Sequence, residues 1–278
     1  MKTETKTEMD TRIERFWLKS YPSAVPHDVD WTQYSSLVHL IEEAFTKYRD
    51  RKAYVSLGKE ISFGEVDEKS KALAAFLQSK GLQKGDRVAI MMPNVLQYPV
   101  AIAGVLRAGL VVVNVNPLYT PRELEHQLED SGAKAIIILE NFAHTLQQIV
   151  SHTQVKEVVL ASMGDLLGFP KGGVVNFVVR HVKKMVPSFE LANVTRFNEA
   201  LAEGARQALR PVQIGQEDPA FLQYTGGTTG VSKGATLVHR NVIANVLQSE
   251  AWMQPAVHDP KKPAPPEQLI TVCALPLY

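Results

Sequence analysis

A glycine- and threonine-rich segment has the clearest capacity for chemistry in this sequence. Between Thr225 and Gly234 the chain reads TGGTTGVSKG. Its glycines let the backbone approach a ligand closely, so successive amide N–H groups can point inward and bind an anion. The hydroxyl groups add donors, and Lys233 adds a mobile positive charge. This combination predicts a site for a polyphosphate.

The same residues allow simpler interpretations. A glycine- and threonine-rich turn that ends in lysine is also typical of a solvated hairpin, because turns favour these residues. A P-loop of the G-x-x-x-x-G-K-[ST] type needs lysine directly after glycine, followed by a helix. Here Val231 and Ser232 separate Gly230 from Lys233, and residues 234–239 resemble a strand. The spacing therefore excludes a P-loop.

Residues 230–234 also match G-x-S-x-G, the nucleophile elbow of serine hydrolases. An elbow serine lies at a sharp turn from strand to helix, whereas Ser232 lies eight residues beyond Tyr224 and precedes another apolar strand. The acid and the histidine should follow in that order, and only Glu250 and His258 do so, close together. A serine hydrolase is kept as a remote alternative.

The elements around this segment predict an α/β fold of mostly parallel sheets flanked by helices, because helical and strand patterns alternate from residue 38 onward. Ser62 and Glu65 form a capping box for a helix over 64–80. Thr120 and Glu123 begin another helix, which ends at Gly132. Further elements are expected as strands at 87–92, 110–116, 134–139, 155–161 and 220–224, and as a helix at 142–152.

Composition excludes several classes of protein. The 278 residues include 30 lysines and arginines and 29 aspartates and glutamates, a formal charge of +1, so no global field attracts nucleic acid. The single cysteine, Cys273, cannot form an intramolecular disulfide, and no cysteine and histidine cluster has metal-ligand spacing. The first twenty residues lack the apolar core of a secretory signal. We expect a cytoplasmic protein with no nucleic-acid partner and no metal ligands of its own.

The nearest approach to a membrane span is residues 88–106, which carry no charge. Pro93, Pro99 and their polar neighbours argue against a span, because a helix that crosses hydrocarbon needs about 20 predominantly apolar residues. This stretch is interpreted as a buried strand, a loop and a helix.

A basic stretch lies between Asp165 and Glu190 and contains no acidic residue. On a helical wheel its valines share one side of a helix over 174–186, and polar residues including Arg180 and Lys183 lie opposite. The simpler interpretation is a surface helix that lays its valines on the domain. The alternative is contact with an anionic membrane surface.

The glycine-rich segment resembles a known signature. LQYTGGTTGVSKG, residues 222–234, resembles the phosphate-binding signature of the adenylate-forming superfamily, which includes acyl-CoA synthetases, luciferases and peptide-synthetase adenylation domains. Residues 17–26, 84–138 and 272–278 resemble bacterial long-chain fatty-acid–CoA ligases in particular, so the similarity covers nearly the whole chain. Gly226 and Ser232 depart from the commoner serine and proline, at positions that vary.

The resemblance implies a reaction in two steps. A fatty-acid carboxylate attacks the α-phosphorus of ATP to give acyl-adenylate and pyrophosphate, and the thiol of coenzyme A then displaces AMP. Fatty acid, ATP and coenzyme A are the implied partners, with Mg²⁺ as the metal cofactor. Lys233 and Thr228 are the implied catalytic residues, with the lysine carrying charge for the departing pyrophosphate. The implied nucleotide-binding residues are Tyr224, Thr225, Gly226, Gly227, Thr228, Thr229, Gly230, Val231, Ser232, Lys233 and Gly234.

The chain resembles only the first part of such a ligase. Residues 1–30 are interpreted as an N-terminal segment and 31–278 as a partial large AMP-binding domain, truncated at its C-terminal end, without the small C-terminal domain. The apolar run 269–278 is expected to be a strand, with Cys273 in the core. We expect poor activity from the 278 residues alone. A non-catalytic nucleotide-binding or assembly module, a homodimer and peripheral contact with the inner face of the cell membrane are left open.

Overall fold

The protein is described by a computed structural model that covers residues 15–225, 232–258 and 267–277. The described residues divide into two compact units. One contains the residues up to Gln33 and those from Ala244 to Thr271, and the other contains Tyr34–Ile243 and the residues from Val272 onward. The second unit holds the sheets and the glycine-rich segment, so it is the unit that positions the candidate site.

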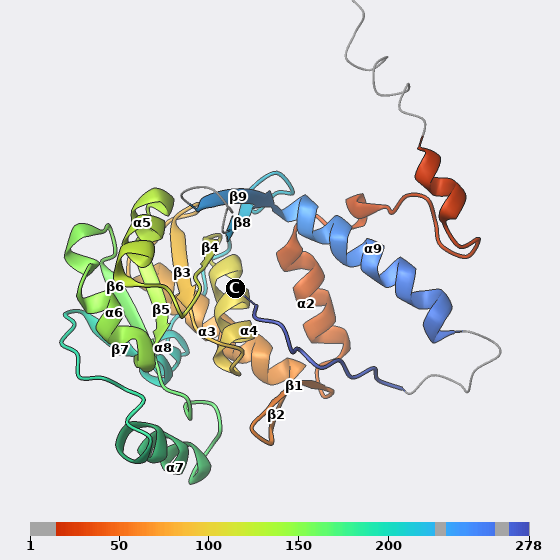
Figure 1. Ribbon diagram of the computed structural model, residues 1–278. Helices are drawn as coiled ribbons and strands as arrows, with labels where there is room; N and C mark the ends of the chain where they lie inside the picture. Colours follow the sequence, from red (N-terminus) through yellow and green to blue (C-terminus); the bar gives the residue numbers. More distant parts are fainter. Residues whose placement is uncertain (1–14, 226–231, 259–266, 278) are drawn as a thin grey trace, which may run out of the picture. The chain divides into compact units, whose positions relative to one another are not determined.

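Within the described residues, seven strands form one sheet in the order β7-β6-β5-β3-β4-β8-β9 (Figure 1). Every neighbouring pair is parallel except β8 and β9, which are antiparallel. A separate antiparallel pair is formed by β1 and β2. The strands are β1 Lys52–Ser56, β2 Lys59–Ser62, β3 Arg87–Met91, β4 Val111–Asn114, β5 Ala135–Leu139, β6 Glu157–Ala161, β7 Val194–Arg196, β8 Pro219–Thr225 and β9 Lys233–Val238.

Helices cover both faces of this sheet. On one face, Leu124, Leu128 and Leu146 of α5 and α6 pack in one core with alternate side chains of the central strands. On the other face α3 packs against α4 and α8. The helices are α2 Leu37–Lys47, α3 Phe63–Ser79, α4 Gln97–Arg107, α5 Pro121–Ser131, α6 Ala143–Gln147, α7 Lys171–Phe177, α8 Phe197–Gly204 and α9 His239–Val257. The predicted α/β fold of mostly parallel strands and flanking helices is confirmed.

The predicted capping boxes are both present. The Ser62 amide donates to the Glu65 carboxylate at 2.8 Å, and the Glu65 amide donates to the Ser62 hydroxyl at 3.1 Å. Thr120 and Glu123 make the same reciprocal contacts at the start of α5. Gly132, which follows α5, takes the left-handed conformation (φ 59°) that favours glycine.

The stretch with the strongest apolar character does not form a span. Residues 88–106 divide between β3, a loop and α4, as predicted. Among the described residues, none of the helices has the length and apolar character needed to cross a membrane.

Two elements differ from their predictions. The helix expected over 142–152 is broken into α6 and short 3₁₀ turns at Glu140–Phe142 and Val150–His152, and Ile149, which is buried, has a non-helical backbone conformation between them. The strand expected over 269–278 is absent from the described residues 269–277. Cys273 is therefore exposed and not in the core.

The basic stretch also differs from the simpler prediction. It forms α7 followed by a π-helical turn, Val178–Val182, in place of one regular helix. Val174 and Val182 are exposed, whereas Val175, Val178, Val179 and Val186 are half-buried, so only part of the predicted apolar side lies on the domain. Arg180 faces inward instead, because its guanidinium group pairs with the buried carboxylate of Glu140.

Close helix packing gives a test of this arrangement. A methyl group at Gly204 of α8 would lie 1.9 Å from the carbonyl oxygen of Ala72 on α3. Gly204→Ala should therefore lower the free energy of unfolding by roughly 1 to 3 kcal/mol, the usual cost of overpacking. Urea unfolding followed by circular dichroism measures the change.

Gly173 provides the matched control, because a methyl group there meets nothing within 4 Å. Gly173→Ala in α7 should leave stability unchanged or raise it by up to about 1 kcal/mol through helix propensity. Equal unfolding midpoints for the two variants would contradict the packing of α8 on α3.

Candidate functional site

The glycine-rich segment follows the carboxyl end of β8, which pairs in parallel with β4. Ligands of open α/β sheets bind at the carboxyl ends of the strands. The chain then returns antiparallel as β9, with Thr225 opposite Lys233 in the register. The two residues therefore flank the segment at the edge where an α/β sheet presents its ligand.

The structure describes part of the predicted site. Tyr224 and Thr225 end β8, Ser232 precedes β9, and Lys233 and Gly234 begin β9. The side chain of Tyr224 is buried, whereas Thr225 and Lys233 are exposed. The remaining predicted residues lie outside the described residues: Gly226, Gly227, Thr228, Thr229, Gly230 and Val231.

Helix α5 contacts both ends of this segment. The hydroxyl of Tyr224 donates to the Asp130 carboxylate at 2.5 Å. Burial, reinforced by the negative Asp130, raises the pKa of Tyr224, so the phenol stays protonated and can donate. The imidazole Nε2 of His126 lies 3.1 Å from the carbonyl oxygen of Ser232. The Ser232 hydroxyl donates to the carbonyl oxygen of Thr225 at 2.9 Å, which joins the two ends directly.

His126 and Asp130 were not predicted from the sequence. They are four residues apart on α5 and so lie on one helix face. The sequence shows that spacing, but nothing near it indicates that this helix face lies beside a strand almost one hundred residues later in the chain. The contact depends on the place of β8 in the sheet.

Gly234 has a packing role beside its predicted binding role. A methyl group at this position would lie 2.8 Å from the ring carbon Cε2 of Tyr224. Only glycine lets the start of β9 approach the tyrosine ring so closely. The ring in turn places its hydroxyl at Asp130.

A polar cluster lines the same edge of the sheet and was also missed. The Asn114 amide, at the end of β4, donates to the side-chain oxygen of Gln223 at 2.9 Å, and its own oxygen accepts from the Tyr98 hydroxyl at 2.9 Å. Asn94, after β3, donates to the carbonyl oxygen of Leu275 at 2.8 Å. Asparagines at the ends of apolar strands were the available signal, because buried polar groups require partners.

Ser232 and His239 could each carry chemistry by residue type, but the structure gives both of them structural roles. Ser232 lies between two antiparallel strands and not at a turn from strand to helix, so it forms no nucleophile elbow. His239 is buried and its Nδ1 accepts the backbone N–H of Leu37 at 3.1 Å. Burial lowers the pKa of His239.

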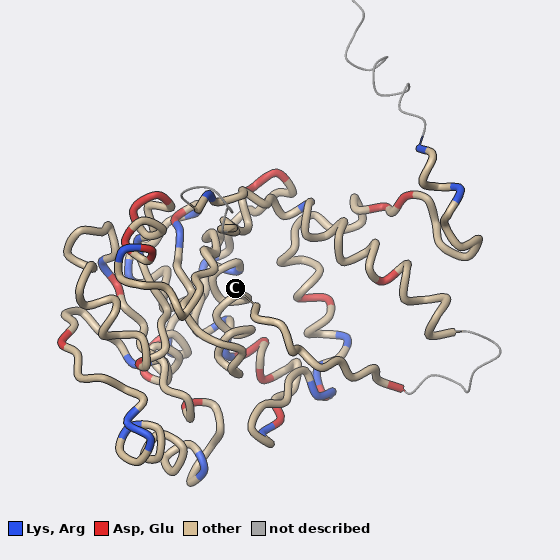
Figure 2. The backbone as a smooth tube through the Cα atoms, in the orientation of Figure 1, with Lys and Arg blue, Asp and Glu red and all other residues tan. Residues whose placement is uncertain are grey.

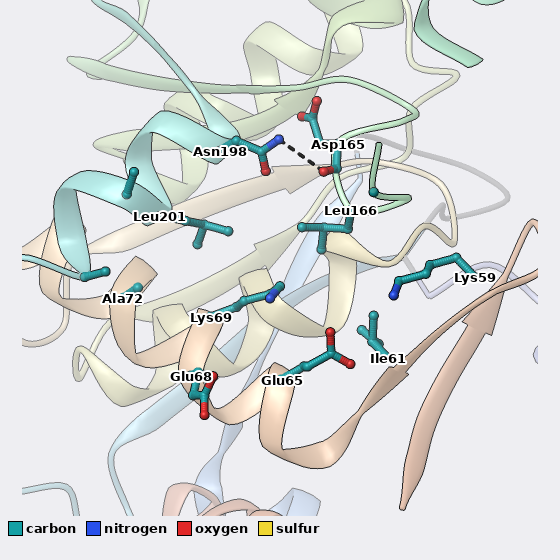
Figure 3. Close-up of a pocket in the computed structure, with 13 residues that line it drawn as sticks. Lys59, Ile61, Glu65, Glu68, Lys69, Ala72, Asp165, Leu166, Asn198 and Leu201 are labelled. Carbon is teal, nitrogen blue, oxygen red and sulfur yellow. Dashed lines mark hydrogen bonds between the residues drawn. The ribbon is translucent and has the colours of Figure 1, made fainter. Parts of the chain in front are cut away.

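A separate cavity of about 490 Å³ lies between β2, α3, α8 and the loop that follows β6 (Figure 3). None of the described residues of β8 or β9 lines it. Its wall includes Asp165, whose backbone oxygen accepts from the Asn198 amide at 3.1 Å. Burial raises the pKa of Asp165 to about 6, although its carboxylate accepts the Ser162 N–H. This carboxyl is costly to ionise, and it lies away from the glycine-rich segment.

Comparisons with known proteins agree with this geometry. The profile of a family described as AMP-binding enzyme matches residues 41–278. The long-chain-fatty-acid–CoA ligase of Salmonella typhimurium is 53% identical over 96% of the chain, and that of Bacillus subtilis is 37% identical over 85%. The chain spans 46% and 42% of those two relatives.

Solved structures show the same fold. The crystal structure of a long-chain-fatty-acid–CoA ligase from Archaeoglobus fulgidus superposes with a TM-score of 0.64 at 27% identity, over 83% of this chain and 42% of that one. An anthranilate–CoA ligase in complex with anthranoyl-AMP superposes with a TM-score of 0.61 at 19% identity, over 76% of this chain and 37% of that one.

The contact between Tyr224 and Asp130 can be tested through stability. Tyr224→Phe removes a hydrogen bond to a charged acceptor, so it should lower the free energy of unfolding by about 1 to 2 kcal/mol. Tyr119→Phe, a half-buried tyrosine just before α5, is the control and should change it little. Chemical denaturation measures both, and equal values would contradict the contact.

The raised pKa of Asp165 predicts a pH dependence. The unfolded carboxyl loses its proton near pH 3.8 and the folded one near 6, so stability should fall as pH rises between these values, by roughly 1 to 3 kcal/mol. Asp165→Asn should flatten this slope and raise stability above pH 6. Denaturation at pH 4 to 7 measures it, with Asp50→Asn as the control for net charge. An unchanged slope in Asp165→Asn would contradict the assignment.

Proposed function

Because the chain belongs to the AMP-binding enzyme family, we propose that it is the N-terminal part of a long-chain-fatty-acid–CoA ligase. The observation that carries the proposal is the glycine-rich segment at the carboxyl edge of the sheet, with Thr225 and Lys233 opposite each other at its two ends. The named function of relatives that are about half identical to this chain supports the substrate class. Residues 31–278 would form part of the large domain, and residues 1–30 a separate N-terminal segment.

The proposed reaction has two steps. A carboxylate oxygen of the fatty acid bonds to the α-phosphorus of ATP while the bond to pyrophosphate breaks. The thiol of coenzyme A then loses its proton, bonds to the acyl carbon and releases AMP. The carboxylate is already a nucleophile, so the protein has to position two anions and balance the charge of the transition state. No covalent protein nucleophile is required.

The glycine-rich segment suits that task. Gly226, Gly227 and Gly230 would allow close backbone approach to the phosphates, and the threonine hydroxyls and amides would donate to them. Thr228 and Lys233 are the proposed catalytic residues. The exposed ammonium group of Lys233, at the first position of β9, can follow the departing pyrophosphate because its stem is flexible. Contacts from α5 to Tyr224 and Ser232 would hold the two ends of the segment in place.

The described residues do not themselves fit a magnesium site. Among them, no group of three histidine, cysteine, aspartate or glutamate side chains is placed to hold a metal ion. Mg²⁺ characteristically keeps several waters and binds through substrate phosphates. We therefore propose that it arrives with ATP, and we assign no step to it here.

The place of action is a further part of the proposal. A long-chain fatty acid partitions into lipid, so a ligase that uses it gains from working at a membrane surface. We propose a cytoplasmic enzyme in peripheral contact with the inner face of the cell membrane. That two copies of the protein form a homodimer stays a prediction.

Lys233 is the most direct target for mutation. In a version of the chain continued to the full length of its relatives, Lys233→Ala should depress fatty-acid-dependent ATP–pyrophosphate exchange by about 10² to 10³, the usual effect of losing one transition-state donor. Lys156→Ala, at an exposed lysine after α6, is the charge-matched control. An unchanged exchange rate with intact folding would remove Lys233 from the catalytic assignment.

The 278 residues alone should be nearly inactive. Because the chain spans less than half of its relatives' length, contacts to the nucleotide and to coenzyme A are expected from residues beyond it. The purified chain should bind ATP weakly in calorimetry and show no exchange above background. Fatty-acid-dependent exchange by this chain would show that the described domain suffices for the first step.

A further inference from the structure

The connection between β6 and β7 carries an unusual exposed surface. Phe169, in the turn before α7, is 99% exposed. Val174 and Phe177 of α7, three residues apart and so on one helix face, are also largely exposed. Val182 and Met185 extend this apolar surface. We call residues 169–186 the β6–β7 segment.

Ion pairs fix this segment to the domain. The Arg180 guanidinium donates to both carboxylate oxygens of Glu140 at 2.9 Å and to the Ser162 hydroxyl at 2.8 Å. Glu140 is buried and also accepts from Arg196 at 3.1 Å. A buried carboxylate that loses a partner is strongly destabilised, so this anchor is expected to persist. Five apolar side chains stay exposed beside this anchor: Phe169, Val174, Phe177, Val182 and Met185.

A second anchor lies at the start of the segment. The Asn176 side chain accepts the backbone N–H of Gly164 at 2.7 Å. Gly172 and Gly164 pack backbone to backbone, with no space for a side chain on either. The exposed apolar face is therefore part of a fixed element, built on the same unit as the sheet.

The charged side chains within the β6–β7 segment all have one sign. Lys183 and Lys184 are exposed beside Val182 and Met185, and no acidic residue lies between Asp165 and Glu190 (Figure 2). Lys171 contacts the carbonyl oxygen of Leu57 in the turn between β1 and β2. Leu57 is itself largely exposed and enlarges the apolar surface.

We propose that the β6–β7 segment docks onto an anionic lipid surface. Apolar and aromatic side chains flanked by lysines are the features of elements that lie in the membrane interface, where the apolar face enters the boundary between headgroups and acyl chains. A second copy of the chain fits less well, because a symmetric contact would bring Lys183 and Lys184 of each copy together. Nucleic acid would not cover Phe169 and Phe177. The proposal rests on the surface and not on the ligase reaction.

Vesicle binding tests the proposal on the purified 278-residue chain. We expect the chain to sediment with phosphatidylcholine vesicles that contain phosphatidylglycerol, to bind pure phosphatidylcholine far more weakly, and to be released by salt. Each lysine near an anionic surface contributes about a fivefold change in affinity. Lys183→Gln combined with Lys184→Gln should therefore weaken binding by at least about tenfold.

The apolar contribution has its own variant and controls. Phe169→Ser combined with Phe177→Ser should weaken binding by about tenfold or more, because two aromatic side chains no longer enter the interface. Leu118→Ser, at an exposed leucine of another loop, and Lys156→Gln should leave binding unchanged. Far-ultraviolet circular dichroism checks that every variant is folded.

A site-specific probe locates the contact. With Cys273→Ser as the background, a fluorophore that reports polarity is attached at Phe177→Cys or, as the control, at Leu118→Cys. Anionic vesicles should shift the emission to the blue at position 177 and not at position 118.

Several results would overturn the proposal. The first is equal vesicle binding by the parent chain and the β6–β7 variants. The second is a blue shift at position 118 only. The third is equal binding to vesicles with and without phosphatidylglycerol. Dimerisation without lipid that disappears in Phe169→Ser with Phe177→Ser would instead assign the face to a second copy. The vesicle assay contains no nucleotide or fatty acid, so a negative result there does not contradict the ligase proposal. A negative result for ATP–pyrophosphate exchange likewise does not contradict the lipid-docking proposal.

Discussion

The parallel pairing of β8 with β4 is the constraint on which the candidate site depends. It aligns Val112 with Phe221 and Asn114 with Gln223, pairs that lie more than one hundred residues apart in the sequence. Parallel strands place their carboxyl ends at one edge of a sheet. The segment after β8 therefore begins beside the ends of β3 and β4, where Asn94, Tyr98 and Asn114 already gather.

Helix α5 links this edge to the rest of the core. Leu124 and Leu128 pack on the sheet and are completely buried, while His126 and Asp130 reach the two ends of the glycine-rich segment. Burying one side of an amphipathic helix fixes the direction of its other side. The position of the site's two ends is thus a consequence of how α5 packs, and a phosphate-binding loop needs such fixed ends to present its amides in one geometry.

The same physical logic governs the β6–β7 segment. Glu140 follows β5 and is buried, and a buried charge must be paired. Arg180 and Arg196 come from different elements to pair with it. Arg180 turns inward to do so, while Val174, Phe177, Val182 and Met185 of the β6–β7 segment stay exposed. An amphipathic pattern alone indicates two sides, but it does not show that Arg180 pairs with a buried carboxylate.

Local patterns determined the elements and were the basis for predicting a phosphate site. Capping boxes, the left-handed Gly132 and runs of β-branched residues act over a few residues, so α3, α5 and the central strands were predictable. The glycines, threonines and Lys233 indicated phosphate chemistry for the same reason. The features that were predicted wrongly share one cause, because each depends on residues distant in the sequence. Residues 269–277 form no strand because sheet pairing, not apolar character, defines one, and Cys273 is exposed as a result.

Tertiary structure alone decided which side chains support the site and which way the basic stretch faces. His126 and Asp130 become relevant only because β8 lies beside β4, and Arg180 turns inward because the buried carboxylate of Glu140 pairs with it. Propensity and capping depend on residues close together in the sequence, so they can be predicted from it. Strand order and the pairing of buried charges depend on contacts between residues distant in the sequence, so they are decided only when the whole chain packs.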